Sequence, residues 1–116
     1  METHALFVYG TLKDREQMET IAHQRNLPEP VAATLTGYAQ HDSGYGFPVA
    51  MPKDGGNITG LVWSGLWEWA FRGLDRYESA GTMYERVRVT VDTIDGPQDV
   101  WFYVGKEDYW AGTLQG

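Results

Sequence analysis

The chain has 116 residues, a formal net charge of −7 at pH 7 and no cysteine. This length fits one domain over residues 1–116, and the missing thiol excludes disulfides, zinc–cysteine sites and a cysteine nucleophile. The acidic excess argues against nucleic acid and anionic membrane surfaces as partners, and no apolar run approaches the ~20 residues that cross a bilayer. We therefore expect a soluble, cytoplasmic protein.

The first half of the sequence predicts short strands and one surface helix. Ala5-Leu6-Phe7-Val8-Tyr9 is an apolar run closed by Gly10, which indicates a buried strand. The polar segment 12–26 contains the helix, and the Gly- and Pro-rich segment 42–48 is a loop. Asp54-Gly55-Gly56-Asn57 is typical of a hairpin turn. Further strands are expected over residues 31–40, 49–51 and 58–67.

The second half begins with a short helix over 69–77, whose candidate buried residues are Trp69, Leu74 and Tyr77. Residues 84–93 alternate with period two, which predicts a strand with its valines on one face. Residues 100–104 are apolar on both faces and indicate a central strand. About six strands with one or two short flanking helices predict an α+β fold, a small mixed β-barrel. The tail over 106–116 holds Tyr109 and Trp110, which could pack back on the barrel, while a loose tail is the alternative and its ending Gly-Thr-Leu-Gln-Gly is expected to be loose.

The segment Tyr9-Gly10-Thr11-Leu12 is the first candidate binding element. A glycine directly after a buried strand lets the chain turn sharply and leaves backbone N–H groups uncovered. Such N–H groups can bind a carboxylate or an oxyanion. The alternative is an ordinary glycine between a strand and a loop.

Glu78 is the candidate catalytic residue. On a helix, Leu74 and Glu78 lie one turn apart on one face, so a buried Leu74 directs Glu78 inward. A carboxylate at the wall of a core is either paired or has a raised pKa, and a raised pKa suits a general base near neutral pH. The alternative is a surface salt bridge to Arg76, Arg86 or Arg88.

The remaining polar and aromatic residues are weaker candidates for a functional role. The three histidines, at positions 4, 23 and 41, share no metal-ligand spacing, so we expect neither a metal nor an organic cofactor. Asp75 is expected to cap the helix or to pair with an arginine. Aromatic residues that could line a pocket, although core positions are the more common role, are Tyr45, Phe47, Trp63 and Trp67.

These motifs, in this order, resemble the γ-glutamylcyclotransferase-like superfamily and especially its AIG2-like branch. The resemblance runs from Tyr9-Gly10-Thr11-Leu12 through Gly37-Tyr38 and Gly46-Phe47-Pro48. Its strongest part is Leu74-Asp75-Arg76-Tyr77-Glu78, followed by the valine-rich strand that begins Tyr84-Glu85-Arg86. Ser79 departs from the pattern, because many members have glycine after the glutamate.

The resemblance implies a mixed barrel with a cavity and an enzyme that cyclises a γ-glutamyl group to 5-oxoproline. Glu78 would be the acid/base catalyst, facing a loop (Tyr9, Gly10, Thr11 and Leu12) that holds the substrate, with Tyr84 and Tyr103 nearby. We expect a small γ-glutamyl amine or peptide as substrate, no cofactor, and a monomer or weak homodimer. The alternative is a non-catalytic member of the same fold that binds a small metabolite.

Overall fold

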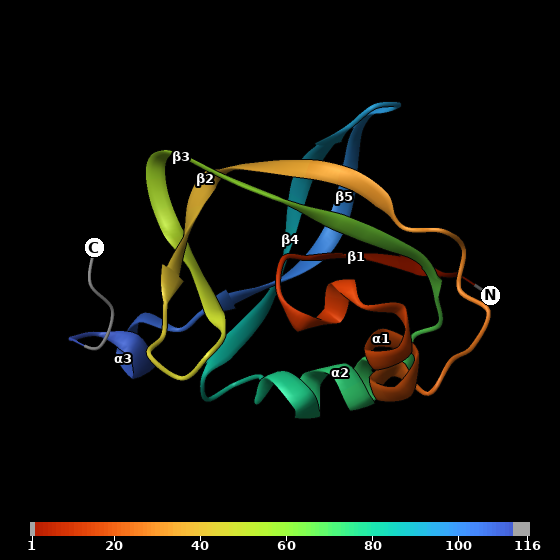
Figure 1. Ribbon diagram of the computed structural model, residues 1–116, viewed down its shortest axis with the longest axis horizontal. Helices are drawn as coiled ribbons and strands as arrows, with labels where there is room; N and C mark the ends of the chain where they lie inside the picture. The colour runs from red at the N-terminus through yellow and green to blue at the C-terminus, as the bar shows by residue number, and fades with distance from the viewer. Residues whose placement is uncertain (1, 113–116) are drawn as a thin grey trace.

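The computed structural model describes residues 2–112, which form a closed five-stranded barrel flanked by helices (Figure 1). The strand order around the barrel is β1-β3-β2-β4-β5, and only the β1–β5 pair is parallel. The predicted α+β mixed barrel is therefore confirmed. In chain order the elements are β1 His4–Val8, the 3₁₀ turn η1 Thr11–Lys13, α1 Arg15–Ala22, β2 Val31–Asp42, β3 Pro48–Leu66, α2 Ala70–Glu78, β4 Tyr84–Thr93, β5 Gly96–Gly105 and α3 Glu107–Trp110.

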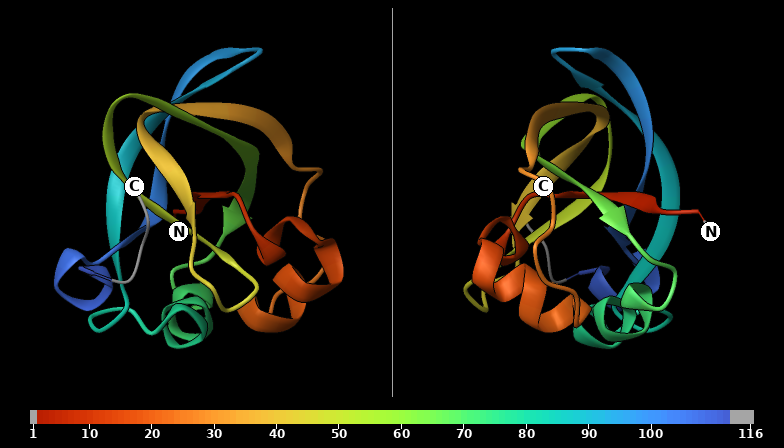
Figure 2. Two further views of the ribbon diagram at one scale, coloured as in Figure 1. Left: turned by 60° about the vertical axis from the view of Figure 1, so that its left-hand side comes forward. Right: turned by 90° about the vertical axis from the view of Figure 1, so that its right-hand side faces the viewer.

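Alternation along the strands divides the core into two clusters. In β1, Phe7 joins a cluster with Phe102, while its neighbours Leu6 and Val8 join a second cluster that also contains residues of α1 and α2. This is the period-two geometry of a strand buried on both faces. Figures 1 and 2 show α1 and α2 side by side along one side of the barrel, so the second cluster fills the space between strands and helices.

The two helices approach closely at Gly73. A Cβ atom at this position would overlap the carbonyl oxygen of Ile21 at the end of α1. Glycine is therefore required there for packing, in spite of its cost within a helix. This contact fixes α2, and with it Glu78, against the N-terminal part of the chain.

The prediction of about six strands was wrong by one, because β3 is continuous. It runs through the expected hairpin at 54–57 and pairs with β2 along nearly its whole length. The register shifts between Thr36 and Tyr38, opposite Gly55 and Gly56, so these glycines allow a bulge rather than a chain reversal. The reversal lies in the loop 43–47, where Gly44 and Gly46 have positive φ.

The helices also differ in detail from the prediction. The segment 12–26 holds the turn η1 and the shorter helix α1, and α2 is shifted by one residue relative to 69–77. Leu74 is buried as expected, whereas Trp69 and Tyr77 are exposed. The start of the tail packs back on the barrel, one of the two alternatives for it: it contains α3, whose Trp110 is buried and donates an Nε1–H hydrogen bond to the Met83 carbonyl at 2.9 Å. Residues 113–116 of the tail lie outside the described residues.

Candidate active site

A cavity of about 400 Å³ lies where the first-strand loop, the end of α2 and the strands β4 and β5 meet. It brings together every residue that the sequence proposed for the site. Its lining is Phe7, Val8, Tyr9, Gly10, Thr11, Leu12, Gly46, Phe47, Pro48, Tyr77, Glu78, Met83, Tyr84 and Tyr103. Glu78 and the first-strand loop thus share one cavity, although their separation in the sequence is large.

The first-strand loop turns into the cavity through η1. The Lys13 N–H donates to the Gly10 carbonyl at 3.1 Å, so the N–H groups of Thr11 and Leu12 take no part in the hydrogen bonds of this turn. A Cβ at Gly10 would make only ordinary contact with Pro48, so neighbouring atoms leave space for a side chain there.

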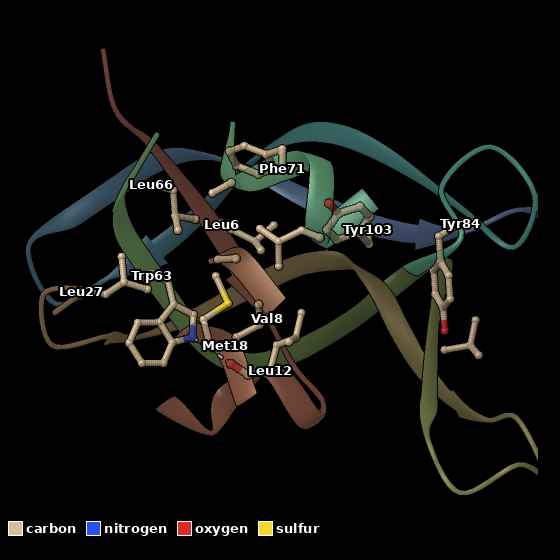
Figure 3. Close-up of a cluster of buried hydrophobic side chains, with 14 of the residues drawn as sticks. Leu6, Val8, Leu12, Met18, Leu27, Trp63, Leu66, Phe71, Tyr84 and Tyr103 are labelled. Atoms are coloured by element: carbon tan, nitrogen blue, oxygen red, sulfur yellow. Dashed lines mark hydrogen bonds between the residues drawn. The ribbon is translucent and has the colours of Figure 1, made fainter. Parts of the chain in front are cut away.

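The buried Trp63 anchors this loop. Its Nε1–H donates to the Leu12 carbonyl at 2.9 Å, and its ring lies in the cluster between barrel and helices (Figure 3). Trp63 was one of the aromatic residues considered for the pocket, and it belongs instead to the core beneath the loop. Thr11 is held from the other side, because its Oγ1 lies 2.8 Å from the Tyr77 hydroxyl.

Glu78 ends α2, and its carboxylate group is partly buried in the cavity wall. Burial raises its pKa from 4.5 to about 7, because the charged form loses hydration. None of the ion pairs among residues 2–112 involves Glu78. The salt bridge to Arg76, Arg86 or Arg88, which the sequence left open, is therefore absent in the described part of the chain.

Three phenol groups surround this carboxylate. Burial is the main cause that raises the pKa values of Tyr9, Tyr84 and Tyr103. The nearby negative charge of Glu78 adds to it in all three, and in Tyr103 the hydrogen bond to Asp75 adds more. All three stay neutral near pH 7 and can act only as hydrogen-bonding groups. Tyr9 donates to the Tyr103 carbonyl at 3.1 Å and accepts from the Ala50 N–H at 3.2 Å, so its hydroxyl links the loop after β1 to β5 and β3.

Asp75 is the centre of a network that includes a tyrosine the sequence did not connect to it. Arg86 Nε and Nη2 donate to its two carboxylate oxygens at 2.8 and 3.2 Å, and the Tyr103 hydroxyl donates to Oδ1 at 2.6 Å. The expected pairing of Asp75 with an arginine is confirmed. Arg86 and Tyr103 sit directly opposite each other in the β4–β5 ladder, which explains why both reach one carboxylate.

The loop between β2 and β3 supplies the apolar rim of the cavity. Ser43 is buried and its hydroxyl donates to the Phe47 carbonyl at 2.7 Å, which holds the loop in shape. Phe47, one of the aromatic residues proposed for the pocket, lines the cavity. Tyr45 is exposed, and its ring stacks on the Phe47 ring with 6.3 Å between the two centroids. Trp67 lies away from this cavity, in a shallow depression beside Phe71.

A metal site is not found in the described part of the chain, which contains no group of three or more His, Cys, Asp or Glu side chains close enough to hold an ion. The search for membrane spans, over residues 2–112, finds no helix long and apolar enough to cross a bilayer.

Comparisons with known proteins place the chain among AIG2-like proteins. Residues 6–114 match the family described as gamma-glutamyl cyclotransferase, AIG2-like. The chain is 30% identical over 91 residues to AIG2-like protein C of Arabidopsis thaliana. That match covers 78% of this chain and 51% of the relative, so the chain spans about half the length of the curated protein.

Solved structures share the fold. A solution structure of an Arabidopsis thaliana protein superposes with a TM-score of 0.81 at 26% identity, covering 100% of this chain and 77% of that one. A structure named gamma-glutamyl cyclotransferase gives 0.76 at 19% identity, covering 90% and 68%. An AIG2-like protein from Mus musculus gives 0.75 at 17% identity, covering 99% and 87%. The last two likenesses support the fold alone.

Proposed function

Because the chain belongs to the gamma-glutamyl cyclotransferase, AIG2-like family, we propose that it is an enzyme that cyclises the γ-glutamyl group of a small γ-glutamyl amine or peptide to 5-oxoproline. The observation that supports this best is Glu78, a carboxylate with a pKa of about 7 in a cavity that it shares with the first-strand loop. An acid/base catalyst is most effective when its pKa lies near the working pH.

In the proposed reaction the α-amine of the substrate attacks its own γ-carbonyl carbon, so a C–N bond forms and a five-membered lactam closes. Glu78 first takes one proton from the α-ammonium group, which makes the amine nucleophilic, and the attacking nitrogen loses its second proton to solvent as the lactam forms. Glu78 then delivers the proton it holds to the leaving nitrogen while the old C–N bond breaks. The products are 5-oxoproline and a free amine, and neither water nor a cofactor is consumed.

The cavity would contribute orientation and charge stabilisation. Freezing the substrate in a folded conformation can be worth several kcal/mol, because effective molarities of well-oriented intramolecular reactions reach about 10⁵ M or more. The N–H groups of Thr11 and Leu12 are suited to the substrate carboxylate or the developing oxyanion. Tyr9, Tyr84 and Tyr103 complete the proposed substrate-binding set with Gly10.

The test is incubation with γ-glutamyl dipeptides, γ-glutamylamines, ε-linked γ-glutamyl-lysine and glutathione while 5-oxoproline is measured. We expect release by the wild type with at least one compound, and a loss of nearly all release in Glu78→Gln. Glu85→Gln, a change of the same kind at an exposed position on β4, is the matched control and should keep wild-type turnover.

Wild-type turnover in Glu78→Gln would contradict the mechanism. Saturable binding of these compounds by calorimetry without any product would favour the non-catalytic, metabolite-binding alternative. We also propose that the chain is one domain in the cytoplasm, a monomer or weak homodimer, whose ligand is a small molecule rather than nucleic acid or a membrane. The net charge of −7 supports the last of these proposals.

A further inference from the structure

Arg86 is held in one position by three side chains. Its guanidinium carbon lies 4.6 Å from the Phe71 ring centroid on α2 and 4.5 Å from the Trp101 ring centroid on β5. Its Nε and Nη2 both bond to Asp75, with 26% of the Arg86 side chain and 35% of the Asp75 side chain exposed. A two-pronged arginine–carboxylate pair whose guanidinium also contacts two aromatic rings fixes orientation as well as distance.

Asp75 lies three residues before Glu78 on α2, so the two carboxylates are neighbours on the helix surface. Glu78 is the last residue of the helix, where the peptide chain has fewer hydrogen bonds to hold it. The Ala80 N–H donates to the Asp75 carbonyl at 2.9 Å, which closes the helix end. Main chain and side chain of Asp75 therefore both tie the last turn of α2 to its surroundings.

Tyr103 connects this network to the cavity. Its hydroxyl donates its proton to Asp75 at 2.6 Å, a short charge-assisted bond, while the residue itself lines the cavity. The Tyr103 hydroxyl proton is therefore used in the bond to Asp75 and is not donated into the cavity. Arg86, Asp75 and Tyr103 link β4, the last turn of α2 and the cavity wall on β5.

We propose that Arg86 and Asp75 are positioning residues, which hold the last turn of α2 and balance each other's charge so that Glu78 stays in the cavity in a form able to exchange a proton. The effect on turnover rests on the function proposed above, whereas the effect on the position and titration of Glu78 does not. Neither side chain lines the cavity, so both act through Glu78 and Tyr103.

The charges around Glu78 make the balance testable. The titratable groups that line the cavity beside it are the phenols of Tyr9 from the loop after β1, Tyr77 from its own helix, Tyr84 from β4 and Tyr103 from β5. Phenols are ordinarily uncharged at neutral pH. No lysine, arginine or histidine lines this cavity in the described residues. Charged side chains that share its helix or its tyrosine network but lie outside the cavity lining include the Asp75–Arg86 pair and the exposed Arg76.

The experiment is a titration of the Glu78 carboxyl carbon by NMR in protein labelled with ¹³C-glutamate, assigned by the resonance that Glu78→Gln lacks. Arg86→Met leaves the Asp75 charge unbalanced and should raise the titration midpoint of Glu78. Asp75→Asn leaves the Arg86 charge unbalanced and should lower it. Each midpoint should move by about 0.5 pH or more, and the double variant should return near the wild-type midpoint.

The matched control is Arg88→Met. Arg88 lies on the same strand and also over Trp101, with 5.0 Å from its guanidinium carbon to the ring centroid, but among residues 2–112 it forms no ion pair with a carboxylate. Its removal should leave the midpoint unchanged. Arg86→Lys keeps the charge and loses the two-pronged geometry, so the midpoint should stay near wild type while kcat falls and KM changes little.

Midpoints that move the same way in Arg86→Met and Asp75→Asn would overturn the proposal, because a cavity that merely opened to water would lower both. Unchanged midpoints in both variants would overturn it as well. The NMR midpoints require no turnover. Opposite shifts in a protein that releases no 5-oxoproline would therefore contradict the proposed function and leave the charge balance standing.

Discussion

The Thr11 side chain and the Tyr77 hydroxyl are joined by a 2.8 Å hydrogen bond between Thr11 Oγ1 and the phenol oxygen. This bond connects the first-strand loop directly to the helix residue that precedes Glu78, at the exposed edge of the cavity. The two halves of the proposed site are therefore linked by a contact that spans 66 residues of sequence.

Removal of this link should weaken substrate binding more than folding. In Thr11→Val the loop keeps its shape, because Trp63 still holds the Leu12 carbonyl, but it loses its bond to Tyr77. An exposed hydrogen bond contributes about 0.5–1.5 kcal/mol, so we expect KM to rise several-fold with little change in the midpoint of urea unfolding. Thr20→Val, on α1 and away from the cavity, is the control, and an equal rise in KM there would contradict the assignment.

Glu78 should make the stability of the wild type depend on pH in a defined window. Its pKa is about 7 in the folded chain and 4.5 as the ordinary value, so the folded state binds more protons between these values. Stability from this group is full below pH 4.5 and is lost as the pH rises through 7. Relative to Glu78→Gln, we expect the wild type to lose about 1–3 kcal/mol over this range.

The measurement is the free energy of unfolding of both proteins in urea at pH 4.5, 6 and 8, because other carboxylates contribute equally to the two chains. A constant difference across the three pH values would show that the folded-state pKa of Glu78 is not raised. If the wild type instead became more stable than Glu78→Gln as the pH rises, the folded-state pKa of Glu78 would be lowered, which contradicts the prediction.

The two cavity tyrosines on β4 and β5 should respond differently to loss of the hydroxyl. Tyr103 donates its proton to Asp75, whereas the Tyr84 hydroxyl makes none of the hydrogen bonds found among residues 2–112 and stays available to a ligand. We expect Tyr84→Phe to lower kcat/KM about tenfold, roughly the 1.4 kcal/mol of one hydrogen bond, with a smaller loss in Tyr103→Phe. Steady-state kinetics with one γ-glutamyl substrate decides between them, and the reverse order would refute this division of roles.

Ser79 offers a stabilising change next to the catalytic candidate. It ends α2 with φ 54°, in the left-handed region where a residue with a Cβ is strained. Ser79→Gly should raise stability by about 0.5–1 kcal/mol, measured as an increase in Tm. Ser64→Gly, within β3, should lower it, because glycine costs conformational entropy in a strand. A fall in Tm for both would show that the Ser79 side chain contributes more than its strain costs.

Local patterns in the sequence predicted the parts of the site that depend on neighbouring residues. The strand before Gly10 follows from an apolar run closed by a glycine, and the inward direction of Glu78 follows from its distance to the buried Leu74. The alternating valines of β4 likewise predicted which face of the strand points inward, and these valines pack in the core cluster that contains Phe7 and Phe102. These inferences need only helix and strand periodicity.

The parts that were missed depend on register and closure. The glycines at 55 and 56 have the local chemistry of a hairpin, and only the register of β2 against β3, which shifts between Thr36 and Tyr38, turns them into a bulge. An arginine partner for Asp75 was expected, but its identity as Arg86 depends on the β4–β5 register together with the position of α2, neither of which a single segment contains.

The parallel contact between β1 and β5 has a consequence for how the protein reaches its working shape. The hairpins β2–β3 and β4–β5 are local, but Phe7 meets Phe102 only when the two ends of the strand order come together, and such long-range contacts carry the largest loop-closure entropy. Tyr9 and Tyr103 are bonded across this seam and both line the cavity. We therefore expect the cavity to be completed late in folding. A ligand bound in the cavity would contact both sides of the β1–β5 contact, so its binding should raise the free energy of unfolding of the whole barrel.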